Sequence, residues 1–552
     1  MRLLVLLKHV ITIYLIFSLL LIASNYVTFY YNSTVEANFT PEQFAGLMNT
    51  TKVYNTDLEI ENITANTSIS LYSYRSSGSK GANAVREYIV NKFEAYGLNV
   101  TEESFDFWTW ELYSKPYLIL DVDNNFSTLE DQYNLTFYAS HYTLPLRDDQ
   151  SYEVYVVTLP KQYEDIPPEF WDNLNLTNKI VFIGFEVLRY KDWRTSFLVR
   201  VSSSSPKAII FMWAFNEHEG WPPYFRSIGG KYPTLFWTKN ITIGWIDWQS
   251  QKILYGILEE GNSRIYAKLF VNSSIFTSEH TNIIGKLEGE SHEKYFIISA
   301  HYDSVVTNAF CDNGMGVSLM LHLAEKLAEL RHKENLKLPY DVYFIAFAAE
   351  ELGLVGSEFY LMNHLDDDIL SVINLDSIGS ETLFIADSIE DQLTDFVEEI
   401  LEENDIQYIT ARAYSDHVPF DDPLSAQELT LYLWGGTLDE SVLERLNDAN
   451  SVPALTIASY PLTLFEGNGY IHTKYDNSTS TSTLGWMNFE NLNAQVRAIA
   501  LVVFSLLTTR NNSTDFSSLF FLAVIIVIII GVGLVVLTYF WRKRKGNMQK
   551  SI

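Results

Sequence analysis

Histidine and acidic residues recur along the middle of the chain in positions where they could bind metal ions. They fall in five segments, which carry His301 and Asp303, Asp312, Glu350 and Glu351, Asp376, and His472. If these segments meet in the fold, burying so many carboxylates without a cation would be strongly unfavourable. Histidine nitrogen and carboxylate oxygen suit zinc, and a chain with one cysteine cannot build a thiolate cage. The pattern therefore predicts a pair of metal ions.

The spacing within the segments suggests which residue bridges the two metal ions and which one orients a histidine ligand. Two metal ions roughly 3.5–4 Å apart need a bridging carboxylate, and Asp312 suits that position because Gly314 and Gly316 allow close backbone approach. Asp303, two residues after His301, can accept the second ring N–H of that histidine.

The adjacent pair Glu350-Glu351 cannot point both side chains the same way from one strand end. One glutamate can therefore bind a metal ion while the other faces an attacking water molecule. A solvated acidic pair would be expected on a helix surface, but this pair directly follows an apolar strand.

The elements that must position these residues alternate between strand and helix from about residue 282 onward. The predicted strands are Tyr295–Ala300, Asp341–Ala349, Ile369–Leu375 and Val452–Ser459, and the predicted helices are Gly314–Leu330, Gly353–Asn363, Asp391–Asn404 and Phe489–Leu507. This order predicts an α/β domain whose mostly parallel central sheet is flanked by helices. In such sheets ligands bind beyond the carboxyl ends of the strands, where the polar segments lie.

Six motifs resemble peptidase family M28, of the aminopeptidase S and aminopeptidase Y type. In family order they are AHYDSV (300–305), CDNGMG (311–316), AAEELGLVGS (348–357), NLDSIG (374–379), SDHVPF (415–420) and IHTKYD (471–476). The resemblance covers about residues 78–507. It implies a zinc-exopeptidase-like fold and hydrolysis of N-terminal residues from peptides.

The resemblance also implies a role for each residue. One zinc ion would be held by His301, Asp312 and Asp376, and the other by Asp312, Glu351 and His472. Glu350 would be the general base that takes a proton from the metal-bridging water and passes it to the leaving amine, with Asp303 as a second catalytic residue. The β-rich stretch of residues 106–276 looks like an inserted protease-associated domain.

Several alternatives remain beside this interpretation. His417 competes with His472 as a ligand, and Tyr414 is only a candidate for stabilising an oxyanion. The insert Asp421–Asn450 departs from the family pattern and leaves substrate size open. A carboxypeptidase or glutaminyl cyclase reaction on the same fold is the main alternative activity, and a receptor without activity is a further one.

The ends of the chain indicate export and membrane attachment. Leu519–Trp541 is apolar and long enough to span a bilayer, and the basic residues Arg542–Lys545 that follow predict a cytoplasmic C-terminus. Val10–Ala23 is either a cleaved signal peptide or a second anchor. Asn-X-Ser/Thr sequons are frequent, yet none begins between Ser273 and Asp476, as expected for a core domain bearing a cleft.

Composition and order give the full domain prediction. The net charge of −30 disfavours nucleic acid as a partner, whereas peptides are the implied substrates, and the oligomeric state stays open. We expect a cell-membrane protein with an extracellular catalytic domain. The predicted parts are a signal peptide or anchor (1–24), an N-terminal segment with the first part of the catalytic domain (25–105), the β-rich insert (106–276), the catalytic domain (277–510), a transmembrane helix (517–541) and a cytoplasmic tail (542–552).

Overall fold

A computed structural model describes most of the chain between Phe39 and Thr508. The described residues are 39–67, 74–127, 132–157, 174–184, 204–212, 240–261, 264–305, 307–387, 392–426, 440–460, 471–472, 475–480 and 487–508. The predicted signal segment, the transmembrane helix, the basic tail and the centre of the insert Asp421–Asn450 lie outside this part. Phe39–Leu507 forms one compact unit.

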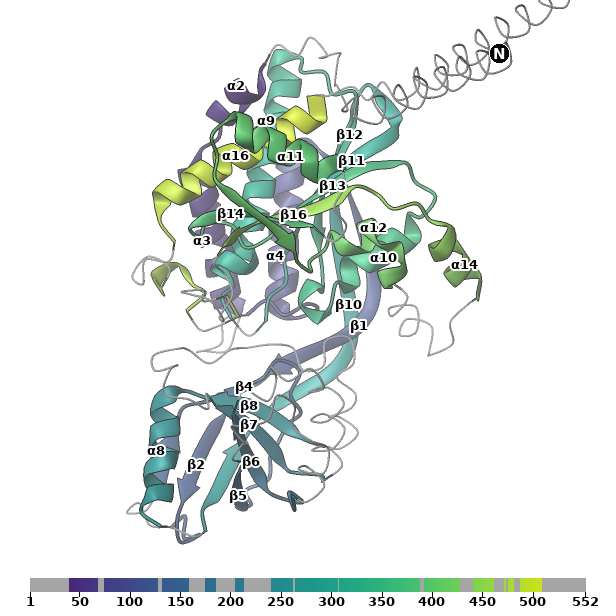
Figure 1. Ribbon diagram of the computed structural model, residues 1–552. Helices are drawn as coiled ribbons and strands as arrows, with labels where there is room; N and C mark the ends of the chain where they lie inside the picture. The colour runs from purple at the N-terminus through teal and green to yellow at the C-terminus, as the bar shows by residue number, and fades with distance from the viewer. Residues whose placement is uncertain are drawn as a thin grey trace, which may run out of the picture. The chain divides into compact units, whose positions relative to one another are not determined.

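The central sheet runs in the order β1-β10-β12-β11-β13-β16-β14-β15 (Figure 1). Its strands are β1 (Asn99–Leu112), β10 (Ser273–Leu287), β11 (Ser291–His301), β12 (Tyr340–Phe347), β13 (Ile369–Leu375), β14 (Thr382–Asp387), β15 (Tyr408–Arg412) and β16 (Ala454–Tyr460). The pairs β11–β12, β11–β13, β13–β16 and β14–β15 are parallel, while β1–β10, β10–β12 and β14–β16 are antiparallel.

The sheet is thus mixed: four of its seven strand pairs are parallel, so the prediction of a mostly parallel sheet is confirmed only in part. The predicted strands at its centre are parallel, as expected. Antiparallel strands lie on both sides of these central strands. On one side β10 pairs antiparallel with β1. On the other side β14 follows β13 after a short turn and pairs antiparallel with β16. A short connection of that kind cannot cross over to a parallel position.

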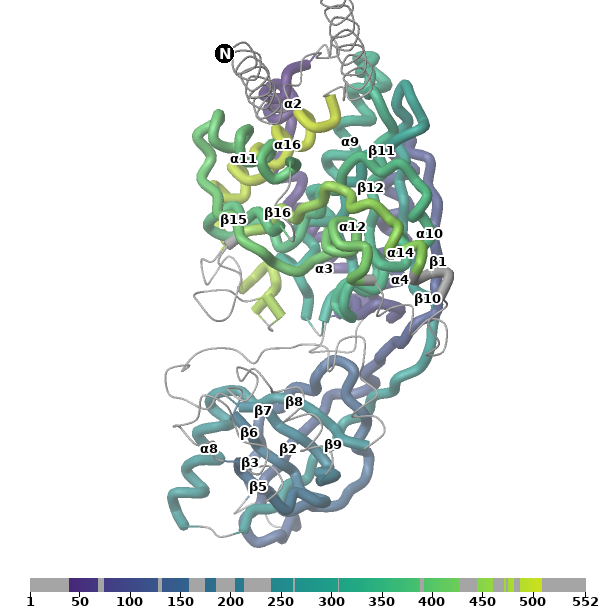
Figure 2. The backbone as a smooth tube through the Cα atoms, turned by 45° about the vertical axis from the view of Figure 1, so that its right-hand side comes forward, coloured from purple at the N-terminus to yellow at the C-terminus, as the bar shows by residue number. Residues whose placement is uncertain are grey.

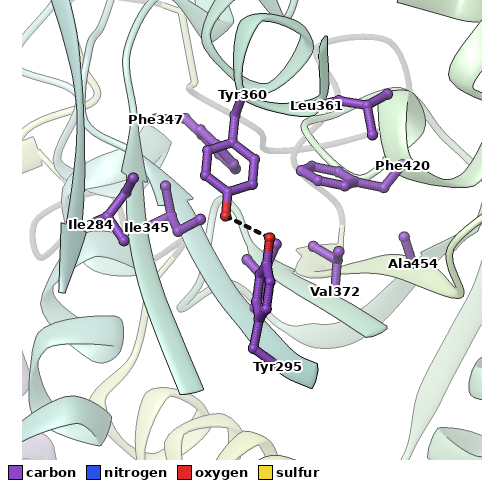
Figure 3. Packing of buried hydrophobic residues seen from close by; sticks show 10 residues of the cluster. Ile284, Tyr295, Ile345, Phe347, Tyr360, Leu361, Val372, Phe420 and Ala454 are labelled. Carbon is purple, nitrogen blue, oxygen red and sulfur yellow. Dashed lines mark hydrogen bonds between the residues drawn. The ribbon is translucent and has the colours of Figure 1, made fainter. Parts of the chain in front are cut away.

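Helices cover both faces of this sheet. They are α4 (Lys80–Ala95), α9 (Gly316–Glu334), α10 (Val355–Asn363), α11 (Gln392–Glu403) and α12 (Val418–Asp421), whereas α14 (Glu440–Asp448) contacts the short turn Pro423–Ala426. On β12, Phe344 contacts Phe93 of α4, whereas the next residue, Ile345, packs in a cluster with Tyr360 of α10 and Phe420 of α12 (Figure 3). Successive strand residues point to opposite faces, so α4 and the α10–α12 pair lie on opposite sides.

The apolar pattern located the main helices within a few residues. The predicted helix Phe489–Leu507 is α16 (Phe489–Thr508), and Gly314–Leu330 is α9 preceded by the irregular turn η4 (Phe310–Met315). α16 is long and apolar enough to cross a membrane, but about two thirds of its most apolar window (67%) is buried inside the fold. It is therefore a core helix, as predicted, among the described residues.

A second sheet lies within the chain between β1 and β10. Its described strands are β2 (Tyr117–Asp121), β3 (Gln132–Leu135), β4 (Phe137–Ala139), β5 (Tyr152–Val157), β6 (Ile180–Gly184), β7 (Ala208–Met212), β8 (Thr242–Ile246) and β9 (Tyr266–Phe270), with α8 (Trp248–Glu259) beside them. Their order is β3-β2-β9-β5-β6-β7-β8-β4. Figure 2 labels all of these strands except β4, which is labelled in Figure 1. The expected boundaries at residues 106 and 276 fall inside β1 and β10, which are long strands.

Two N-terminal helices were not anticipated from the sequence. α2 (Pro41–Gly46) contacts α16 through stacked Phe44 and Phe504 rings, 4.5 Å apart. α3 (Thr50–Thr67) packs against α4, α9 and η4. Its placement against η4 matters for the site, since η4 carries Asp312.

Candidate metal centre

Five segments meet where the sequence predicted, beyond the carboxyl ends of the central strands. His301 is the last residue of β11, and Asp376 directly follows β13. Two groups of side chains could each hold a metal ion: His301, Asp312 and Asp376 form one, and Asp312, Glu351 and His472 form the other. Within each group the potential ligand atoms all lie within 4.8 Å of one another.

Asp312 belongs to both groups and presents one oxygen to each. Its Oδ1 lies 3.1 Å from Nε2 of His301, and its Oδ2 lies 2.9 Å from Nε2 of His472. On the outer sides, Asp376 Oδ1 is 3.5 Å from His301 Nε2, and Glu351 Oε2 is 3.1 Å from His472 Nε2. This is the arrangement that two ions bridged by one carboxylate require.

Glycines bring the Asp312 turn close to its neighbours, as predicted. A Cβ atom at Gly316 would lie 2.6 Å from the carbonyl oxygen of Leu375, and one at Gly314 would lie 2.0 Å from Asp57 Oδ1. Real Cβ atoms do not approach so closely, so both positions need glycine. The Asp312 turn can therefore pack directly against the end of β13, next to Asp376.

Histidine ionisation responds to the gathered carboxylates. Burial opposes a charge on His301, yet Glu350 and Asp376 raise the pKa of this histidine well above its ordinary value. Burial alone would raise the pKa of Asp312, but contacts with His301 and His472 bring it below the ordinary value. The buried carboxylates thus attract any available positive charge, which a metal ion would supply.

Glu350 and Glu351 follow β12 on a sharp turn. Ala349, just before them, has φ of +60°, a left-handed conformation that is uncommon outside glycine and is found often at functional sites. The turn sends Glu351 to the second metal group and leaves Glu350 outside both groups. Burial, and beyond it the Glu351 and Asp416 charges, raise the pKa of Glu350 well above that of an ordinary glutamate, although His301 opposes the shift.

Asp303 lies beside His301, but its hydrogen bonds go to another segment. The sequence suggested a hydrogen bond to His301, but Nδ1 of His301 is 3.5 Å from Asp303 Oδ1 and makes no hydrogen bond by geometry. Asp303 instead accepts from the main-chain N–H groups of Glu350, at 3.1 Å, and of Glu351, at 3.4 Å. It lies fully buried between the first ligand and the glutamate turn.

The structure distinguishes the two histidines that could complete the second metal group. His472 joins Asp312 and Glu351, whereas His417 is buried with Nδ1 2.8 Å from Thr456 Oγ1 and belongs to neither group. Next to it, Ser415 donates to Asp376 Oδ2 at 2.8 Å. Tyr414 is 62% exposed. Its role in stabilising an oxyanion stays a prediction.

The part of the chain that carries these residues is similar to known proteins. Residues 282–497 match the profile described as peptidase family M28. This part of the chain belongs to that family. The M28 region contains every residue of the two metal groups. The resemblance drawn from the six motifs is thereby confirmed.

Individual curated relatives match only part of the chain. Aminopeptidase YwaD of Bacillus subtilis (strain 168) is 28% identical over 200 residues, which is 34% of this chain and 41% of that protein. The chain therefore spans less than half the length of this curated relative.

Solved structures share the fold over most of the chain. A zinc aminopeptidase from Bacillus subtilis, BSAP, superposes with a TM-score of 0.54 at 18% identity, covering 83% of this chain and 95% of that one. A peptidase M28 precursor from Shewanella amazonensis SB2B gives a TM-score of 0.58 at 17% identity, covering 86% and 96%. The α/β fold with a mixed central sheet is thus the fold of M28 aminopeptidases.

Proposed function

We propose that this protein is a di-zinc aminopeptidase that removes N-terminal residues from peptides. The observation that carries the proposal is the shared Asp312, whose two oxygens face His301 and His472 from opposite sides. The donors fit zinc: both groups combine one histidine nitrogen with carboxylate oxygens. Nε2 of buried His301 also faces carboxylate oxygens of both Asp312 and Asp376, which suits a shared metal ion.

His301, Asp312 and Asp376 would hold one ion, and Asp312, Glu351 and His472 the other. Bound there, the ions would supply Lewis-acid chemistry for the hydrolysis of a peptide bond. Glu350 would act as the general base, accepting a proton from the attacking water and passing it to the nitrogen of the leaving amine. This exchange needs a carboxyl group that is not itself a metal ligand, and Glu350 belongs to neither metal group.

The setting of this activity rests on sequence features. The apolar run Leu519–Trp541 followed by basic residues supports a membrane anchor with a cytoplasmic C-terminus. The apolar N-terminal segment and the sequons support export, so the M28 region would act on extracellular peptides. The second sheet, inserted between β1 and β10, supports the assignment of a protease-associated domain.

The test uses the full-length chain and its Glu350→Gln variant. We expect two zinc ions per chain in both proteins, release of the chromophore from an aminoacyl nitroanilide by the wild type, and activity about 10²–10⁴-fold lower in the variant. An N-acetylated copy of the substrate should resist hydrolysis. Two bound zinc ions without cleavage of the free-amine substrate would overturn the aminopeptidase assignment.

Related assays separate the alternative reactions. Release of a C-terminal residue from an N-blocked peptide would indicate a carboxypeptidase. Ring closure of an N-terminal glutaminyl peptide with full activity at one zinc ion per chain would indicate a cyclase. Either result would replace the proposed reaction while retaining the metal centre.

A further inference from the structure

Asp476 ends the motif that carries His472, yet it belongs to neither metal group. Its side chain is fully buried. Oδ1 accepts a hydrogen bond from the main-chain N–H of Cys311 at 2.7 Å, and Oδ2 accepts one from that of Asp312 at 3.2 Å. The carboxylate therefore holds the backbone of the bridging residue with both oxygens.

This contact joins two segments that are far apart in sequence. Asp312 lies in η4, before α9, and His472 lies four residues before Asp476. The main chain adds to the contact, since Phe310 N–H donates to the carbonyl oxygen of Asp476 at 3.4 Å. A displacement of Asp476 would consequently shift Asp312 relative to His472.

Residues outside the M28 match hold the same two segments. Glu61 of α3 accepts hydrogen bonds from Asn308 Nδ2 at 2.8 Å and from Ser478 N–H at 3.2 Å, so it also links both loops. Arg75 is buried and donates to the carbonyl oxygens of Asn308, at 2.5 Å, and Ala309, at 2.8 Å. The segment that leads into η4 and Asp312 is thus held by the side chains of Glu61 and Arg75, which are not metal ligands.

We infer that Asp476 is a positioning residue of the metal centre, which sets the separation of Asp312 and His472 and thereby the affinity for zinc at both groups. The inference rests on the metal-binding part of the proposed function. Because one side chain accepts hydrogen bonds from two successive main-chain N–H groups, it fixes both the position and the direction of that backbone. Because Asp312 is shared, loosening its backbone affects both ions, unlike the loss of an outer ligand.

The main test is zinc affinity of full-length Asp476→Asn, measured by competition with a chromophoric chelator. An asparagine keeps one acceptor oxygen but turns its NH₂ group toward the second N–H donor. We expect affinity about 10- to 100-fold weaker than in the wild type, as for other side chains that orient ligands. Both zinc ions should be lost over the same chelator range.

A matched control separates positioning from stability. Asp387 at the end of β14 is also buried and accepts from Thr394 Oγ1 at 2.8 Å, but it contacts neither ligand segment in the described structure. Asp387→Asn should lower the thermal unfolding midpoint and leave zinc affinity unchanged. Circular dichroism of the metal-free proteins checks that each variant is folded.

A second variant decides the matter if Asp476→Asn does not fold. Glu61→Ala removes the other link between the two loops at a helical position that accepts alanine well. Zinc affinity should fall in this variant, by less than in Asp476→Asn. Wild-type zinc affinity in a folded Asp476→Asn protein, or in Glu61→Ala when the former is unfolded, would overturn the inference. Failure of the wild type to bind zinc would instead overturn the proposed function.

Discussion

The carboxylate of Asp303 accepts a hydrogen bond from the main-chain N–H of Glu350 at 3.1 Å. The same carboxylate lies 3.5 Å from His301 Nδ1. Asp303 therefore contacts both the segment that carries the proposed base and the first metal ligand. Its main structural effect is on the glutamate turn, where the strained φ of Ala349 needs support from its surroundings.

Asp303→Asn should consequently reduce kcat more than it changes KM. Both Asp303 oxygens accept from the glutamate turn, so in asparagine the NH₂ group must face one of these N–H donors and the turn loses its fixed position. We expect kcat about 10- to 100-fold lower, measured with an aminoacyl nitroanilide alongside zinc content. Asp341→Asn is the control, because Asp341 is equally buried but pairs with Lys286 at 2.7 Å at the start of β12. An unchanged kcat would contradict the role given to Asp303.

Removing zinc should destabilise the fold as well as abolish activity. Ligands that bind only the folded state stabilise it, by about 2.7 kcal/mol at a free concentration 100 times Kd. Chelation should therefore lower the thermal unfolding midpoint, and added zinc should restore it. In Asp312→Ala both groups lose their shared oxygens, so its midpoint should not respond to zinc. A zinc response equal to that of the wild type would contradict the shared role.

Arg75 provides a separate test of the support behind the site. Its guanidinium is buried and donates to three carbonyl oxygens, of Tyr302, Asn308 and Ala309. Neighbouring carboxylates, led by Asp57, balance its charge against the cost of burial. Arg75→Met leaves these carbonyl oxygens without their donor and the buried carboxylates without a nearby positive charge.

The expected loss for Arg75→Met is about 3–5 kcal/mol of unfolding free energy, as for other broken buried ion pairs. Urea unfolding followed by circular dichroism measures it. Arg86→Met serves as the control, since Arg86 pairs with Glu102 at 3.5 Å on a partly exposed surface and should contribute at most about 1 kcal/mol. Equal losses in the two variants would show that Arg75 makes no special contribution.

The contrast between Arg75 and His301 explains what the sequence could reveal. His301, Glu351 and Asp376 sit at or just after strand ends that periodicity located, so their meeting follows from the rule for parallel strands. Arg75 lies in a polar segment before α4 with no periodic pattern, and it acts through carbonyl groups, which leave no trace in side-chain spacing. Asp476 stood inside a recognised motif, but only coordinates show that it binds main-chain N–H groups.

The directions of the outer strands in the mixed sheet are a second feature that the sequence did not predict. Periodicity identified β11, β12, β13 and β16 because apolar runs and helices surround them. β15 (Tyr408–Arg412) is mostly exposed and carries no apolar run, so it gave no signal. Strand direction depends on pairing between distant segments, which local sequence does not encode.

His364 should make stability depend on pH. Its Nε2 lies 2.7 Å from Glu103 Oε1 and its Nδ1 lies 2.8 Å from Asp367 Oδ2, while the Tyr360 ring stacks on it. Burial would lower the pKa of His364, but the two carboxylates raise it above the ordinary value. The folded protein therefore binds this proton more tightly than the unfolded chain. The resulting stabilisation is complete below a pH of about 6.5 and disappears as the pH rises through the folded pKa.

In His364→Gln this stabilisation should be missing at low pH. The thermal unfolding midpoint of the variant should thus fall further below that of the wild type at pH 6 than at pH 9, measured by circular dichroism at constant ionic strength. His332→Gln is the matched control, because His332 is exposed near the end of α9 and its substitution should produce a small difference at either pH. A gap between His364→Gln and the wild type that stays constant from pH 6 to pH 9 would show that the carboxylates do not tighten the proton on His364. The network between β1 and α10 would then contribute only packing, through the stacked ring of Tyr360.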